Sequence, residues 1–79
     1  MDRQAWIERI AIDPAVHHGE PCIKGTRIPV SVIVGSIADG DRPEELLSAY
    51  PSLTSEDVRA ALFYAAEAVR AAPLVPLVP

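Results

Sequence analysis

Three breaks divide the second half of the chain into short segments and so limit what it can fold into. Pro29 has no backbone N–H, which is harmless only at the start of a helix. Asp39-Gly40 provides the left-handed conformation that commonly ends a helix, and Pro51 ends the next segment. The breaks predict three short to medium helices joined by tight turns. The first of these has apolar residues at helical spacing, at Val30, Ile33, Val34 and Ile37.

The second and third predicted helices each begin with a capping sequence. Asp41 and Glu44 have the spacing of a capping box, and we expect Leu46, Leu47 and Tyr50 to face inward. Thr54 and Asp57 repeat that spacing at the start of the third helix. In that helix, alanines at positions 60, 61, 66 and 68 allow close helix approach, and an apolar stripe is expected at Val58, Leu62, Ala65 and Val69.

The residues up to about Val30 favour extended structure. Asp2 to Glu8 fit one or two helical turns with Trp6 and Ile7 on the apolar face, and Ile10 and Ile12 alternate with polar or small residues as in a short strand. Asp13-Pro14 predicts a turn, and Pro21 to Ile28 a second strand in which Gly25 makes a kink or bulge. Two strands alone are unstable in water, so they must pack on helices or on another chain.

These elements predict one small α+β domain, mainly α, over residues 1–72. A short N-terminal β-hairpin precedes a three-helix bundle with the shape of a helix-turn-helix. We expect Thr26 and Arg27 to hold the turn before the first helix of the bundle, through hydrogen bonds to backbone carbonyls or to an acid.

Size and composition indicate that the domain binds a second copy of itself. A chain of 79 residues has a marginal core, yet 49% of its residues are hydrophobic, so we expect a homodimer with twofold symmetry. An enzyme is not expected at this size. The single cysteine excludes a disulfide framework, and neither a signal peptide nor a membrane span is evident, so we expect a soluble, cytoplasmic protein.

No stretch of the sequence predicts a cofactor or a metal site. Residues 19–26 are close to a phosphate-binding loop, but Lys24 precedes Gly25 and no helix starts directly after Thr26. His17, His18 and Cys22 lack a fourth Cys or His that would close a structural zinc site, and Cys22 is expected in the core.

The candidate nucleic-acid contacts are Lys24, Arg27, Arg42 and Arg59, acting across a dimer. Against this, the chain has a net charge of −4, and the third helix begins Thr54-Ser55-Glu56-Asp57. Carboxylates aimed at phosphates oppose the electrostatic attraction that dominates nucleic-acid affinity.

The last residues, 73–79, form a proline-rich tail with proline at every third position. This spacing forbids a helix and favours an extended polyproline conformation. We expect the tail to bind a partner protein through Leu74, Val75, Leu77 and Val78, or else to fold back over its own dimer.

The box Lys24-Gly-Thr-Arg-Ile-Pro-Val30, with the later runs Pro43–Leu47 and Leu53–Val58, resembles the bacterial domain-of-unknown-function 433 family over residues 9–65. The resemblance implies a helix-turn-helix-type domain, often encoded beside a PIN-like ribonuclease toxin and regarded as its antitoxin. Two residues depart from the family pattern. Glu20 replaces a common cation, and Arg42 stands where a small or apolar residue is common.

Two functions follow as hypotheses. In the first, the chain is the antitoxin of a type II toxin–antitoxin pair, which masks a PIN-like ribonuclease toxin and can also repress its own operon by binding operator DNA. The acidic balance favours this hypothesis, because acidic groups complement an RNA-binding cleft. In the second, it is a stand-alone helix-turn-helix DNA-binding transcriptional regulator.

Overall fold

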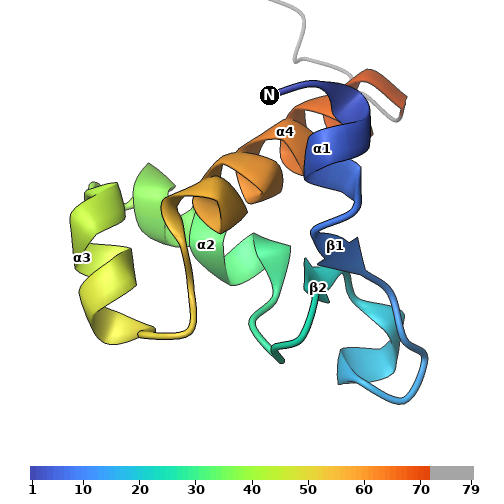
Figure 1. Ribbon diagram of the computed structural model, residues 1–79, viewed down its shortest axis with the longest axis horizontal. Coiled ribbons are helices and arrows are strands. Elements are labelled where there is room, and N and C mark those ends of the chain that lie inside the picture. The colour runs from blue at the N-terminus through green and yellow to red at the C-terminus, as the bar shows by residue number, and fades with distance from the viewer. Residues whose placement is uncertain (72–79) are drawn as a thin grey trace, which may run out of the picture.

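The computed structural model describes residues 1–71, which form a small helical domain with a two-stranded hairpin (Figure 1). This confirms the predicted α+β fold, mainly α. In chain order the elements are α1 (Arg3–Ile7), β1 (Ile10–Ala11), a 3₁₀ turn (His17–Gly19), β2 (Cys22–Ile23), α2 (Val30–Ala38), α3 (Pro43–Ala49) and α4 (Ser55–Ala71).

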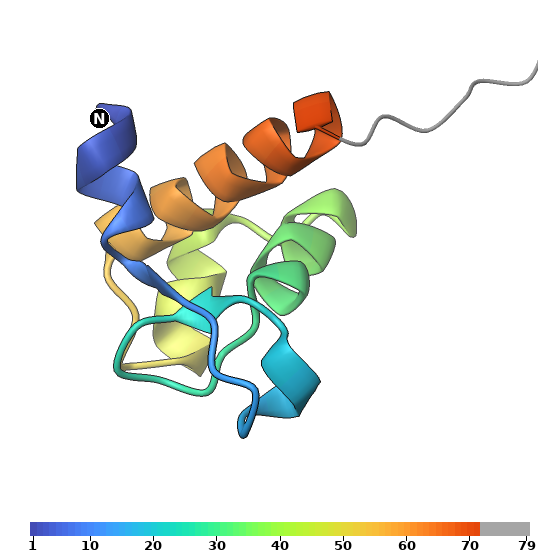
Figure 2. The same ribbon diagram turned by 90° about the vertical axis from the view of Figure 1, so that its right-hand side faces the viewer.

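The longest helix, α4, is the element on which the other helices pack. It contacts α2, α3 and α1, and α1 lies against it at the far side from α3 (Figures 1 and 2). The core forms where β2, α2, α3 and the start of α4 meet. Its buried residues are Ile23, Val30, Ile33, Leu46, Leu53, Val58 and Ala61.

The hairpin is shorter than the sequence predicts. β1 and β2 pair antiparallel with Ile10 opposite Ile23, and Ile12 lies beyond the strand with 59% of its surface exposed. The predicted strand over 21–28 is wrong, because the chain reverses directly after Ile23. The Ile23 N–H donates to the Ile28 carbonyl at 3.0 Å, so residues on either side of the reversal pair with each other.

The reversal is a tight turn held by a threonine. Gly25 has φ +80°, so it supplies the left-handed conformation of the turn rather than a strand bulge. The Thr26 hydroxyl donates to the Ile23 carbonyl at 2.7 Å and accepts from the Ile28 N–H at 3.0 Å. The expected role of Thr26 is therefore confirmed.

Arg27 contributes to this loop through its backbone. Its carbonyl accepts a hydrogen bond from His17 Nε2 at 2.9 Å, which ties the 3₁₀ turn to the loop before α2. The Arg27 guanidinium is exposed and has no ion pair within residues 1–71. The prediction that this side chain holds the turn is therefore wrong.

The helix ends follow the predicted breaks, with one shift. Asp39 caps the end of α2, and Gly40 follows with φ +103°. The Asp41–Glu44 capping box is wrong by one residue, because Arg42 is the cap residue of α3 and Glu45 Oε1 accepts its N–H at 3.2 Å. Pro43 explains the shift, since proline fits best in the first helical position and so fixes the cap at the residue before it.

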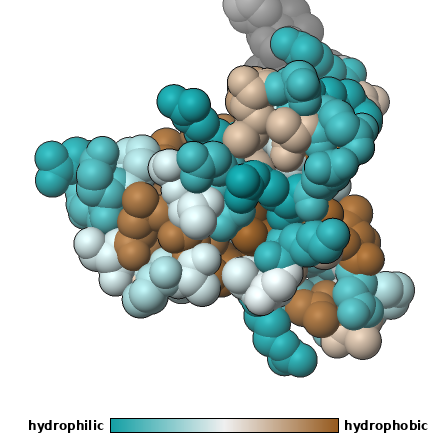
Figure 3. Space-filling view, viewed as in Figure 1, coloured by the Kyte–Doolittle hydropathy of each residue, from teal (hydrophilic) through white to brown (hydrophobic). Residues whose placement is uncertain are grey.

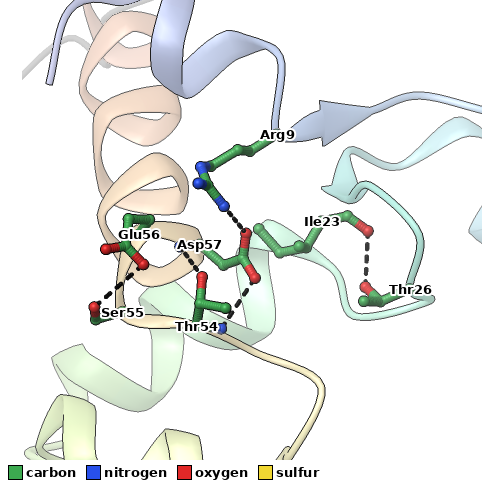
Figure 4. A network of polar contacts seen from close by, with 7 residues as sticks. All are labelled: Arg9, Ile23, Thr26, Thr54, Ser55, Glu56 and Asp57. Carbon is green, nitrogen blue, oxygen red and sulfur yellow. Dashed lines mark hydrogen bonds and ion pairs between the residues drawn. The ribbon is translucent and has the colours of Figure 1, made fainter.

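The capping box of α4 forms as predicted and also joins the two halves of the chain. The Asp57 N–H donates to Thr54 Oγ1 at 3.2 Å, and Asp57 Oδ2 accepts the Thr54 N–H at 3.0 Å (Figure 4). Asp57 Oδ1 also lies 3.1 Å from Arg9 Nη1, ahead of β1. Asp57 is only 7% exposed.

The buried face of α4 differs from the predicted stripe. Val58 is in the core as expected, but Leu62 is 39% and Val69 is 63% exposed. Ala60 and Ala61 are fully buried instead, because their small side chains let α1 and α2 approach the helix closely.

Replacing Asp57 with alanine is expected to lower the free energy of unfolding by about 2–3 kcal/mol. The change removes the half of the α4 capping box that the Asp57 side chain makes, and it leaves the Thr54 N–H and the Arg9 guanidinium without this partner. Urea denaturation followed by circular dichroism measures the loss. Glu56→Gln changes the exposed neighbouring carboxylate and should alter stability by less than about 0.5 kcal/mol. Equal effects of both changes would contradict the role given to Asp57.

Thr26→Val keeps the shape of the side chain but removes both of its hydrogen bonds. We expect a loss of about 1–2 kcal/mol in thermal or urea unfolding, whereas Thr26→Ser should retain most of the stability. Arg27→Ala should leave stability within about 0.5 kcal/mol of the wild type. A destabilising Arg27→Ala would show that the guanidinium, and not the backbone, supports the loop.

Candidate functional site

The four candidate nucleic-acid contacts lie on different elements. Lys24 is in the turn after β2 and Arg27 is three residues further along the same loop, both exposed. Arg42 caps α3, and its Nε lies 3.3 Å from Glu45 Oε1. Arg59 is in the second turn of α4. The hairpin lies near the beginning of α2 and α3 follows its end (Figure 1), so the loop with Lys24 and the cap with Arg42 come from opposite ends of that helix.

The α3–α4 pair has the helix-turn-helix arrangement, but its second helix begins with carboxylates. The Asp57 carboxylate accepts hydrogen bonds from the Thr54 N–H and from Arg9, whereas Glu56 is exposed. The pKa of Glu56 is lowered, chiefly because its carboxylate accepts a hydrogen bond from its own backbone N–H, with smaller contributions that include Arg9. The end of α4 that would approach a DNA phosphate therefore carries stable negative charge.

The densest run of acidic residues in residues 1–71 spans the turn between α2 and α3 and the first turn of α3. Residues 39–45, which we call the acidic corner, hold the exposed side chains of Asp39, Asp41, Glu44 and Glu45 around Arg42. Arg42 is already paired with Glu45. Within residues 1–71 the other three carboxylates have no ion-pair partner. Figure 3 shows hydrophilic residues over the end of the molecule where α3 begins.

The outer face of α4 is apolar in its middle. We use this name for Arg59, Leu62, Phe63, Ala66, Val69 and Arg70, which recur at helical spacing. Leu62 and Phe63 are 39% and 42% exposed. With Met1, Arg59 and Ala66 they line an open hollow of about 400 Å³.

Phe63 had no role in the sequence-based prediction. Its ring stacks on that of Trp6 with centroids 6.2 Å apart, and Trp6 meets Tyr64 edge-on at 6.3 Å. These contacts and the Arg3–Glu67 ion pair at 2.8 Å fix α1 on α4. The signal for this face was a second stripe at helical spacing, on the side of α4 opposite Asp57 and Ala61.

His17, His18 and Cys22 do not form a metal site in the described chain. Across residues 1–71, no group of three or more His, Cys, Asp or Glu side chains is placed to hold a metal ion. Cys22 is buried, as predicted, and burial raises the pKa of its thiol, which disfavours the reactive thiolate. His17 and His18 are exposed and both have positive φ.

The proposed partner-binding residues Leu74, Val75, Leu77 and Val78 lie outside the described residues. Among the helices of residues 1–71, none is both long and apolar enough to span a bilayer.

Comparisons with known proteins identify the family. Residues 10–65 match the model of the family described as "Protein of unknown function (DUF433)". The uncharacterized protein y4eO of Sinorhizobium fredii is 39% identical over 64 residues, which cover 81% of this chain and 29% of that protein. The chain thus spans under a third of the length of this curated relative. A crystal structure of a DUF433 member from Anabaena variabilis is similar with a TM-score of 0.76 and 38% identity, over 86% of this chain and 67% of that one. Both the matched segment and the shared fold show that this chain belongs to the DUF433 family.

Proposed function

We propose that this chain acts as an antitoxin, a protein-binding module that masks the RNA-binding cleft of a PIN-like ribonuclease toxin. The observation that carries the proposal is the acidic corner. Its three carboxylates without an ion-pair partner in residues 1–71 lie within six residues of one another, on the exposed turn after α2 and the first turn of α3. The resemblance of the sequence to an antitoxin-like family supports the same function.

The physical basis is charge complementarity. A nuclease cleft that binds RNA presents cations to phosphates, and carboxylates on a rigid turn can occupy those positions instead. The acidic corner is well suited to this role because it is held at both ends. Asp39 and Gly40 end α2, and the Arg42–Pro43 start of α3 follows directly. Little conformational entropy is then lost when the corner binds.

A stand-alone DNA-binding regulator is the second function, and the α3–α4 arrangement favours it. The charges do not. Glu56 and Asp57 occupy the start of α4, and in the described part of the chain only Lys24 and Arg27 are two exposed cations on one loop. Repression of the operon by a complex with the partner remains compatible with the antitoxin proposal, since the partner can supply cations.

The proposal predicts a PIN-like ribonuclease gene beside the gene for this chain, and co-expression with that nuclease tests it. We expect the wild type to restore growth, and the double variant Asp41→Asn, Glu44→Gln to restore it less and bind the nuclease at least tenfold more weakly at low salt. Glu45 is left intact because it caps α3.

A matched control changes the same number of acids away from the corner. Glu8→Gln with Asp13→Asn removes two exposed carboxylates near the hairpin and should leave neutralisation unchanged. Continued toxicity beside well-folded wild-type protein would overturn the antitoxin proposal. If instead the free protein shifts its own upstream DNA, and this shift weakens steeply with salt through Lys24, Arg27, Arg42 and Arg59, the regulator function is supported.

A further inference from the structure

The charges along α4 are arranged in opposite order on either side of Phe63. Arg59 lies four residues before Phe63 and Glu67 four after it, while Glu56 lies seven before and Arg70 seven after. At 100° per residue, all four positions fall within about 40° of Phe63 around the helix. Each acid on one side of Phe63 therefore has a base at the same distance on the other side.

We propose that the outer face of α4 binds the same face of a second copy, with the two α4 helices antiparallel and crossing at Phe63. A twofold axis at this residue brings Arg59 toward Glu67 of the other copy, and Glu56 toward its Arg70. Each pair occurs twice in the dimer. A parallel arrangement would instead place like charges opposite each other, so the charge order selects the antiparallel one.

The centre of the face supplies the apolar contact. Leu62, Phe63 and Ala66 line the open hollow of about 400 Å³. One face of the Phe63 ring stacks on Trp6, but Leu62 and Phe63 still expose 39% and 42% of their surface within residues 1–71. Ala66 is small enough to let a second helix approach closely. Two such faces cover each other's apolar residues.

The charged residues remain available for this contact. Within residues 1–71, Arg59, Arg70 and Glu56 have no ion pair. Glu56 contacts Ser55 at 3.4 Å and also interacts with its own backbone, with Thr54 and, at longer range, with Arg9. Glu67 is paired with Arg3, but its side chain is 44% exposed and can accept a second cation. The Glu56–Arg70 pair is therefore the cleaner one to test.

The test uses two charge reversals on the full chain, Glu56→Arg and Arg70→Glu. Residues 56 and 70 are about 21 Å apart along one helix, so they cannot pair within a chain. Each variant alone should dimerise roughly tenfold more weakly than the wild type, because two attractive pairs become repulsive. An equimolar mixture should recover the wild-type affinity, since each mixed dimer contains two attractive pairs, one with the charges exchanged and one unchanged.

Sedimentation velocity measures the dimer population, with circular dichroism as a check that each variant is folded. Both reversals also oppose the dipole of α4 and lower its stability, but mixing does not repair that effect. Recovery on mixing therefore reports contact between copies. Glu44→Arg, with the same change of charge on α3, is the control and should dimerise like the wild type.

Three outcomes would overturn the proposal. The wild type could sediment only as the 8.5 kDa species throughout the micromolar range. It could form a dimer that neither reversal weakens, or the mixture could dimerise no better than each variant alone. None of these outcomes depends on toxin neutralisation. The experiment therefore tests the dimer contact separately from the antitoxin function.

Discussion

The carboxylate of Asp57 is the contact on which the arrangement of the domain depends. It caps α4 through Thr54 and reaches Arg9, which lies 48 residues earlier in the chain. A carboxylate that is 7% exposed would be unfavourable without such partners, and here both of its oxygens have one. The same side chain thus ties the start of α4 to the residue directly ahead of β1.

The sequence predicted the helices well because their ends are decided locally. Gly40 and the Thr54–Asp57 capping box act through residues within one turn of the helix end, so their effect is visible in the sequence. The shift from Asp41 to Arg42 is also local, since Pro43 competes with the capping preference of Asp41. The hairpin was less predictable. Its reversal at Gly25 depends on pairing between Ile23 and Ile28, which a pattern of apolar residues over 21–28 does not distinguish from one longer strand.

The buried face of α4 and the candidate surfaces show where such prediction ends. Two apolar stripes are present on α4, and only the packing of α1 and α2 decides which one is covered. The spacing of apolar residues alone therefore predicts Leu62 and Val69 in the core and gives no role to Phe63. The acidic residues of the corner were visible in the sequence, but their exposure on one turn was not. At Arg27 the motif predicts that the side chain holds the turn, but in the structure the backbone carbonyl holds it, by accepting a hydrogen bond from His17.

The dependence of the other helices on α4 has a consequence for synthesis of the chain. The ribosome produces α1, the hairpin, α2 and α3 before α4, yet α1 has its main packing partner in α4, as does α2. Until α4 emerges, Trp6 and the apolar face of α2 have little to bury themselves against. Folding of the domain therefore waits for α4, and the nascent chain presents apolar surface to chaperones during that interval.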